Sequence, residues 1–201
     1  MGEIPSGWSI GSLSDLLDLF DINPEKTTPK WDERKINYID IASVGFCAIK
    51  SEPEEMFYDE APSRARRIVK HRDLLISTVR PKRRSIIMIL NPKEHTLAST
   101  GFAQLRSKNK WFGNFLFGLI TSPKFTSELK MVGYGAAYPA VSTADICRVP
   151  FALPPPELIK RFGEIVEPFV MQMGQSSRYS SRLNEINSVL LPRVMSDELL
   201  I

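Results

Sequence analysis

The chain has 201 residues, of which 43% are hydrophobic and 24% charged, and its formal net charge is +3. This balance is that of an ordinary globular protein, and the length favours one sizeable domain with an appendage over two full domains. A membrane protein is excluded, since no run approaches the ~20 apolar residues that a bilayer requires. With no signal-peptide pattern at the N-terminus, we expect a cytoplasmic chain.

The first third of the chain alternates short apolar segments with polar ones. A turn at residues 5–8 leads into a short strand, and residues 14–19 predict a short helix. Residues 36–44 alternate apolar and polar side chains, which is typical of a strand. The flanking segments, residues 21–32 and 50–63, are polar and contain prolines, so we expect surface loops there.

The middle of the chain predicts a sheet followed by helices. The β-branched runs at residues 74–79 and 86–90 predict a hairpin, and residues 96–105 a strand broken by Gly101. Residues 111–120 are apolar almost all round, which indicates a helix buried against a sheet. Ser122 followed by proline predicts a second helix that runs to residue 132.

Residues 133–139 are mostly small and predict a loop. After this loop the sequence predicts the start of another helix and then one more strand. Ser142 and Asp145 have the spacing of a capping box, and residues 148–153 predict the strand. The fold class is therefore a mixed α/β (α+β) globular domain, residues 1–152. The remainder, residues 153–201, predicts one long helix.

The last quarter of the chain carries a heptad pattern that we call the apolar stripe. Its members follow one another at 4,3,4,3 spacing: Leu158, Phe162, Ile165, Phe169, Gln172, Ser176, Tyr179, Leu183, Ile186 and Leu190. Such a pattern predicts a coiled coil, with a kink or a break at Pro168. The alternative is a helix buried in its own domain. A helix of roughly 50 Å is too long for that, which favours another helix as partner.

The ends of the apolar stripe favour an antiparallel pair of two identical helices. The N-terminal cluster of Phe162, Ile165 and Phe169 would then meet the partner's C-terminal cluster of Leu183, Ile186 and Leu190. The polar middle positions would meet each other. We therefore expect an antiparallel homodimer of two-fold symmetry.

Positive charge is concentrated in residues 64–84, which we call the basic window. The window contains nine basic residues and one acidic residue, Asp73, so its net charge is +8 and that of the rest of the chain is −5. The nine are Arg64, Arg66, Arg67, Lys70, Arg72, Arg80, Lys82, Arg83 and Arg84. This density favours a polyanionic partner. A solvated face without a partner is the alternative, and Arg80 before Pro81 has a structural alternative of its own.

The sequence has no pattern typical of catalysis. It lacks a phosphate-binding P-loop and a dinucleotide fingerprint. Cys47 and Cys147 lie far apart, as expected of two free and buried thiols, and His71 and His95 have no metal-ligand spacing. We predict no cofactor, no metal and no enzymatic activity, although a nuclease carboxylate pair stays open as a third interpretation.

At the basic window the sequence resembles a known family. Residues 61–70 and 73–81 are similar to the target-recognition domain of type I restriction–modification specificity subunits, although Arg72 stands where members commonly have glycine. The resemblance extends to Pro5 and Gly7-Trp8, to residues 135–142 and 149–155, and to residues 183–196. It covers nearly the whole chain, with the motifs in the family's order.

The resemblance implies a function. A full subunit of this family holds two target-recognition domains joined by two long antiparallel helices, and each domain reads half of a split DNA site. The subunit itself is non-catalytic and brings methyltransferase (M) subunits, and through them the restriction (R) subunit, to the DNA. One domain and one helix correspond to half a subunit. A stand-alone dimeric DNA-binding or regulatory protein is the alternative.

Under this resemblance the expected partner is double-stranded DNA. Phosphate contacts would come from basic side chains, and base contacts from polar and basic loops. The candidate DNA-binding residues are Arg64, Arg66, Arg67, Lys70, Arg80, Lys82, Arg83, Arg84, Lys108, Tyr134 and Tyr138.

Overall fold

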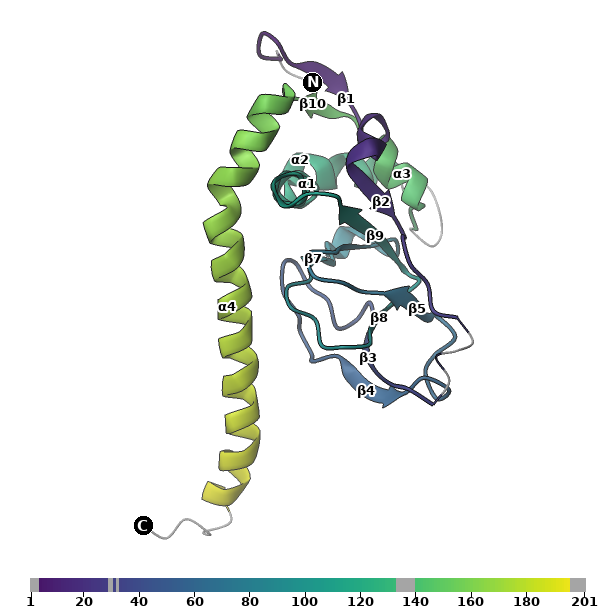
Figure 1. Cartoon of the computed structure of the whole chain (residues 1–201), viewed down its shortest axis with the longest axis vertical. Coiled ribbons are helices and arrows are strands. Elements are labelled where there is room, and N and C mark those ends of the chain that lie inside the picture. The colour runs from purple at the N-terminus through teal and green to yellow at the C-terminus, as the bar shows by residue number, and fades with distance from the viewer. Residues whose placement is uncertain (1–3, 29–30, 32, 133–139, 196–201) are drawn as a thin grey trace. The chain divides into compact units, whose positions relative to one another are not determined.

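A computed structural model describes residues 4–28, 31, 33–132 and 140–195 of the chain. It contains two compact units, one up to Glu167 and one from Pro168 onward. The first unit holds all the strands (Figure 1). The long helix α4 (Pro156–Met195) begins in the first unit and makes up the described part of the second.

One four-stranded sheet forms the centre of the first unit, and all its pairs are antiparallel. Its strand order is β2 (Phe20–Ile22), β9 (Phe102–Ser107), β6 (Leu74–Ser77) and β7 (Ile86–Met88). Every residue of β6 and β7 is buried, which explains their unbroken apolar sequences. The predicted hairpin is confirmed, since Leu75 pairs with Ile87.

A second four-stranded sheet is interleaved with the first along the chain. Its strand order is β4 (Glu54–Phe57), β3 (Lys35–Ile39), β8 (Thr96–Ser99) and β5 (Ala65–Ile68). The β3–β8 pair is parallel and the other two pairs are antiparallel. Gly101 separates β8 from β9, so the predicted break is confirmed and also moves the chain from one sheet to the other.

The apolar core joins the two sheets. Leu75 and Ile87 of the first sheet pack with Ile39 and Ala98 of the second, around the fully buried Phe102. A smaller cluster, around Ile36, Tyr38, Tyr58, Ala65 and Leu97, lies on the second sheet. Burial of this many branched and aromatic side chains is the main source of stability of the unit.

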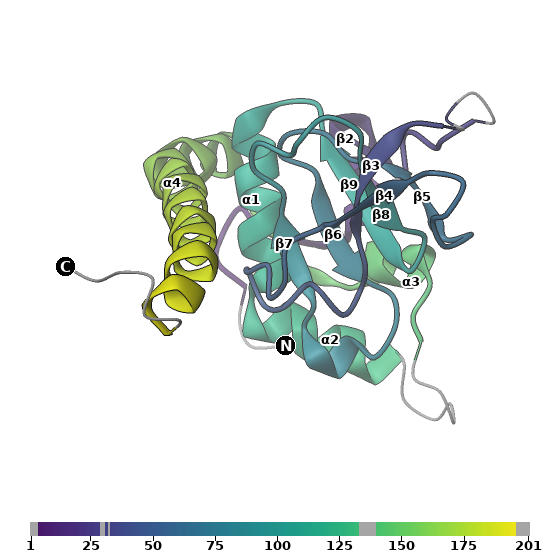
Figure 2. The ribbon, with the colours of Figure 1, turned by 90° about the horizontal axis from the view of Figure 1, so that it is seen from below.

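Helix α1 (Lys110–Thr121) lies against the first sheet, and helix α2 (Pro123–Val132) packs on α1 (Figure 2). Helix α1 follows Asn109, whose side chain accepts a hydrogen bond from the Phe112 amide. The helix contacts β7 and β9, and its Phe112 ring stacks on Phe20 of β2. Helix α2 has the predicted bounds. Helix α3 (Thr143–Arg148) begins with the predicted capping box of Ser142 and Asp145.

The two ends of the first unit pair with each other. Strand β1 (Ser9–Gly11) lies antiparallel to β10 (Phe151–Leu153), directly before α4. Between β1 and β2, the 3₁₀ helix η1 (Leu13–Leu19) replaces the predicted helix and is one residue longer at its start. The mixed α/β fold class is thus confirmed, with the long helix after it.

Some predictions of local structure were inaccurate, among them the strand expected at residues 148–153, which begins only at Phe151 because Arg148 ends α3. Strands β2 and β4 lie in segments expected to be loops, because a three-residue strand and an exposed edge strand leave little apolar pattern. Strand β3 ends at Ile39, since the Asp40 side chain accepts a hydrogen bond from the Ala42 amide and turns the chain. Cys147 is buried as expected, but Cys47 is partly exposed; both are free.

Helix α4 continues through Pro168 and Pro192 without interruption, so the predicted break at Pro168 does not occur. The six apolar stripe residues expected at the dimer contact are all exposed: Phe162, Ile165, Phe169, Leu183, Ile186 and Leu190. A coiled coil stays a prediction, because the structure describes a single chain.

Candidate nucleic-acid interface

The basic window divides between two places in the fold. Residues 64–70 contain strand β5, at the edge of the second sheet, whereas residues 80–84 lie in the connection between β6 and β7. This connection contains the 3₁₀ turn η3 (Pro81–Arg83). A count of charges along the sequence therefore combines two different surfaces.

Arg64 and Arg66 are held by tyrosines of the second sheet. The Arg64 Nε donates to the Tyr38 hydroxyl at 3.1 Å, and its Nη2 lies 2.8 Å from an Asp40 carboxylate oxygen. The Arg66 guanidinium donates to the Tyr58 hydroxyl and lies over the Tyr58 ring. Arg64 is exposed, and an exposed ion pair is weak enough to open for a phosphate.

Arg67 points the other way and is only 7% exposed. Its Nη2 donates one long hydrogen bond, 3.4 Å, to the Thr100 carbonyl, while Nε and Nη1 have no hydrogen-bond partner. Burial lowers the pKa of this guanidinium. Little of its surface is left for a contact with DNA.

The acid of the window, Asp73, is fully buried and organises a polar network. Its two carboxylate oxygens accept from Nε and Nη2 of Arg106, each at 2.7 Å, and one also accepts from the Gln104 side chain. Glu25 accepts from both Arg106 and Lys70, the latter at 2.5 Å. The hydrogen bond from Lys70, together with Arg106, holds the pKa of Glu25 below its usual value. Lys70 is thus paired, but exposed.

Arg72 connects the sheet to the start of α4. Its guanidinium donates to the Asn114 side chain at 2.9 Å and to a Glu167 carboxylate oxygen at 2.6 Å. The Asn114 amide in turn donates to Glu167 and to the Gly163 carbonyl. Arg72 has a φ of 70°, the left-handed region that favours glycine.

The turn between β6 and β7 carries four of the nine cations of the window. Lys82 and Arg83 are exposed on η3, and within the described part of the chain no ion pair involves them. Arg80 is also exposed, and its backbone caps η3 in a left-handed conformation. Arg84 differs: its Nη2 donates to the Thr121 carbonyl at 2.6 Å.

Three further candidates lie outside the window. Lys108 is exposed just before α1, and no ion pair of a described residue involves it. Tyr134 and Tyr138 lie outside the described residues.

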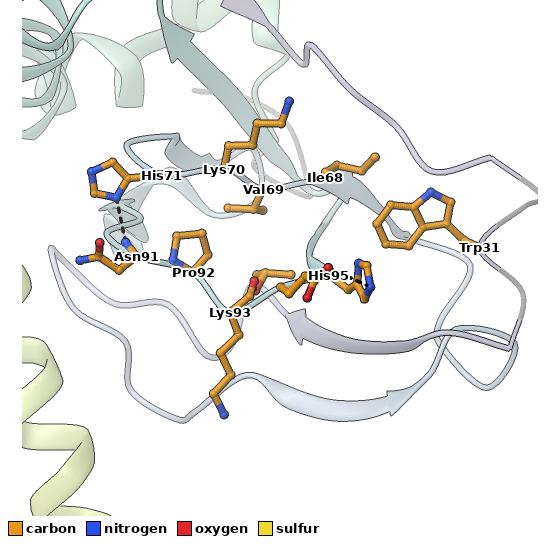
Figure 3. A pocket seen from close by; sticks show the side chains of 11 residues that line it. Trp31, Ile68, Val69, Lys70, His71, Asn91, Pro92, Lys93 and His95 are labelled. Carbon is orange, nitrogen blue, oxygen red and sulfur yellow. Dashed lines mark hydrogen bonds and ion pairs between the residues drawn. The ribbon is translucent and has the colours of Figure 1, made fainter.

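An open depression of about 530 Å³ lies beside β5 and β8 (Figure 3). Trp31 and His95 face each other edge-on at one end, with ring centroids 5.4 Å apart. At the other end the Asn91 amide donates to Nδ1 of His71. The Lys70 and Lys93 side chains point away from its centre, and the Glu94 carboxylate lies 3.6 Å from His95. This mixed lining is less suited to a polyanion than the turn between β6 and β7.

The structure adds one surface residue that the sequence did not indicate. Phe46, in the turn between β3 and β4, is 45% exposed, and the Arg84 guanidinium lies 3.8 Å from its ring centroid. Phe46 lies in a mostly apolar segment, between Val44 and Ile49, so its sequence context gives no signal of exposure. The described residues contain no group of three or more metal-ligating side chains, and none of their helices is both long and apolar enough to span a bilayer.

Comparison with known proteins gives matches among solved structures. Neither the protein-family models nor the curated proteins match this sequence. A chain from a structure on complex assembly and conformational transition of the type I restriction–modification system is 27% identical, with a TM-score of 0.68 over 98% of this chain and 50% of that one.

Two further structures are similar. The HsdS subunit from Thermoanaerobacter tengcongensis is also 27% identical, with a TM-score of 0.65 over 97% of this chain and 50% of its own. The S subunit of a type I system from M. genitalium is 17% identical, with a TM-score of 0.53 over 92% of this chain and 45% of its own, and it supports the fold alone.

These neighbours define the class of the chain: a mixed α/β domain with a long helix, of the kind found in type I restriction–modification systems. More narrowly, the chain has the fold of one half of a type I specificity subunit. It spans about half the length of the chains that it matches.

Proposed function

We propose that this chain is a DNA-recognition component of a type I restriction–modification system. Its likeness, along nearly the whole chain, to half of an HsdS subunit carries the proposal. The exposed cations on the turn between β6 and β7 support it, since phosphate contacts supply most of the affinity of such proteins for duplex DNA. The expected compartment is the cytoplasm.

In this role the chain performs no chemistry and needs no cofactor. It binds double-stranded DNA and brings a methyltransferase (M) subunit, and through it a restriction (R) subunit, to the site. The exposed apolar stripe of α4 pairs with the same helix of a second copy, antiparallel, so that two identical domains read a split inverted repeat.

The test is co-expression of the full chain with the methyltransferase subunit of its own system, followed by sequencing of modified bases in the host DNA. We expect methylation at a split site whose two halves are inverted copies, because two identical domains would read them. The methyltransferase subunit expressed alone is the control and should leave these sites unmodified.

Two results would contradict the proposal. One is a soluble, co-purifying complex that methylates no specific site. The other is the same methylation pattern without this chain. A dimer that binds specific DNA but does not co-purify with a methyltransferase would instead favour the stand-alone regulatory protein.

A further inference from the structure

Two turns lie side by side at the start of β7. The first, residues 44–49, is closed by a 2.8 Å hydrogen bond from the Gly45 amide to the Ala48 carbonyl. The Cys47 amide donates to the Ile86 carbonyl, and the Ile86 amide donates to the Gly45 carbonyl. The second is the connection around η3, which leads directly into Ser85 and Ile86. Backbone pairing to one strand therefore holds both turns on the same rigid support.

The Phe46 side chain is presented outward on this support. Arg84 lies over its ring and is itself tied to the Thr121 carbonyl at the end of α1. This arrangement covers part of the ring with a fixed cation and leaves 45% of the residue exposed. Arg84 therefore acts as a support for the ring, because its guanidinium already lies between Phe46 and α1.

Three of the eight described non-glycine residues with a positive φ lie at the same place. Cys47, Arg80 and Arg84 have φ values of 56°, 52° and 52°, which are left-handed and uncommon for residues other than glycine. Residues in such conformations persist where the surrounding structure imposes them, and they cluster at functional sites. Here all three flank the exposed ring and the exposed cations.

Positive charge surrounds the ring. Lys82 and Arg83 are exposed on the neighbouring turn. The Lys50 side chain lies across Gly45, where its Cε is 2.8 Å from the place that a Cβ would take. Within the described residues, none of these three cations forms an ion pair. We call this set, Phe46 with Lys50, Lys82 and Arg83, the Phe46 surface.

A second exposed phenylalanine provides a contrast. Phe57, on the edge strand β4, is 43% exposed and also has a cation over its ring, Lys35 at 5.8 Å. Lys35 is neutralised by Glu55 at 3.4 Å, and both residues follow ordinary strand geometry. An aromatic side chain with an unneutralised basic rim is therefore a feature of the Phe46 surface and not of every exposed phenylalanine in the domain.

We propose that the Phe46 surface is where this domain contacts bases in duplex DNA. Lys50, Lys82 and Arg83 bind phosphates on either side, and the Phe46 ring makes an apolar contact with the bases between them. This inference rests on the proposed DNA-recognition function. Unneutralised cations favour a polyanion over an apolar protein surface, and aromatic side chains are among those that proteins use for apolar base contacts.

The test uses the full chain and a duplex of about 40 base pairs selected by the wild-type chain from a random-sequence library. A shuffled duplex of the same composition measures non-specific binding. Phe46→Ala should weaken binding to the selected duplex by about 10- to 100-fold, the size of a lost aromatic–base contact, and leave the shuffled duplex almost unaffected. Phe46→Leu should lose less, because it keeps an apolar side chain.

Substitutions of the exposed cations and of Arg84 should differ in which duplexes they weaken and in their effect on salt dependence. Lys82→Gln with Arg83→Gln should weaken both duplexes alike and reduce the slope of log affinity against log salt by about 1.8, or about 0.9 for each lost phosphate contact. Arg84→Met should lower the ratio of specific to non-specific binding and leave the salt slope unchanged, since it repositions the ring without removing a phosphate contact.

Matched controls separate this proposal from the proposed function. Phe57→Ala, and Lys160→Gln with Arg161→Gln, remove similar groups from elsewhere on the first unit and should change neither affinity nor salt slope. If Phe46→Ala keeps the wild-type affinity, the Phe46 surface does not contact bases, and the proposed function in DNA recognition is unaffected. A wild-type chain that enriches no sequence would overturn DNA recognition itself. Circular dichroism of each variant confirms that it is folded.

Discussion

Neighbouring arginines of the basic window have opposite environments. In strand β5 the side chains alternate, so Arg66 lies against Tyr58 on the outer face while Arg67 is directed inward. In the turn between β6 and β7, Arg83 is exposed whereas the next residue, Arg84, is tied to Phe46 and Thr121. Net charge predicts a polyanionic partner, but only side-chain direction shows which cations are available to such a partner.

Arg67 gives a prediction about stability. A buried guanidinium with two unpaired nitrogens costs folding free energy, and an apolar side chain of similar length removes that cost. Arg67→Met should therefore stabilise the domain by about 1–3 kcal/mol. The measurement is the midpoint of urea unfolding, followed by tryptophan fluorescence, with the slope unchanged.

The neighbouring residue, Arg66, provides the control for this prediction. Arg66→Met removes a guanidinium that lies over the Tyr58 ring, and should destabilise by about 0.5–1 kcal/mol. If Arg67→Met instead destabilises the domain more than Arg66→Met does, the hydrogen bond from Arg67 to Thr100 stabilises the fold by more than burial of the charge destabilises it.

Asp73 shows what the sequence could not indicate about the window. It was counted as the one acid among nine cations, yet it is fully buried and bonded to Arg106, which lies outside the window. The Asp73 hydrogen bonds raise the pKa of Arg106. The Arg106 and Gln104 side chains reach Asp73 because β9 pairs with β6, and that pairing is a long-range property of the sheet.

At the scale of the elements, the first turns of α4 pack mainly through residues outside the apolar stripe. Ile159 is buried, and the Gly163 backbone approaches α1 so closely that an added Cβ would lie 2.0 Å from the Trp111 carbonyl oxygen. Phe162 contacts the Phe115 ring, edge to face, but stays 43% exposed. The heptad pattern therefore predicted the exposed face of the helix, while the packed face depends on a glycine that carries no hydrophobic signal.

Glu167 gives a prediction of pH dependence for this packing. Burial raises the pKa of its carboxyl, but hydrogen bonds from Asn114 and the Arg72 charge outweigh it and hold the pKa below the usual value. Such a group stabilises the fold above its unfolded pKa of about 4.3 and loses this contribution as the pH falls through its folded pKa. Glu167→Gln should thus cost about 1.5–3 kcal/mol at neutral pH and progressively less below pH about 4.

Urea unfolding of wild type and variant between neutral pH and pH about 3 measures this difference. Glu164→Gln is the matched control, since Glu164 is exposed on the same helix and has no ion pair among the described residues. A Glu167→Gln cost that stays constant over this pH range would show that the ion pair with Arg72 does not stabilise the fold.

For the whole molecule, the decisive prediction concerns association through α4. Burying a leucine or isoleucine contributes roughly 1.5–3 kcal/mol, and Leu183 and Ile186 are both exposed in the single chain. Leu183→Asp with Ile186→Asp should convert a dimer into monomers, measured by sedimentation equilibrium at tens of micromolar. Ser180→Asp with Ser188→Asp, which adds the same charge outside the apolar stripe, should stay dimeric.

A wild-type monomer under the same conditions would contradict the homodimer. The helix would then require a different partner, such as the second helix of a chain twice as long, since the solved chains that it matches have about twice its length.

Local patterns predicted much of the fold but little of the candidate site. Caps and periodicity were sufficient for α1, α2, α3 and the hairpin of β6 and β7, because those signals act between residues close in sequence. The Phe46 surface forms only when the turn after β3 is paired to Ile86 and when Arg84 reaches Thr121. Both contacts join distant segments, so no local pattern encodes them.

The interleaving of the two sheets has a consequence for synthesis. The chain passes from β5 in one sheet to β6 and β7 in the other, then back to β8 and again to β9. The second sheet is complete only when β8 has been made, up to Ser99, and the first only when β9 has been made, up to Ser107. Strand β1 waits for β10 at Phe151. The consecutive strand pairs, β3 with β4 and β6 with β7, can form early, and the β6–β7 pair has the shorter connection. A nascent chain would therefore expose the apolar strands of the first sheet until Ser107 had left the ribosome, and would then fold slowly, because most of its strand pairs join distant segments.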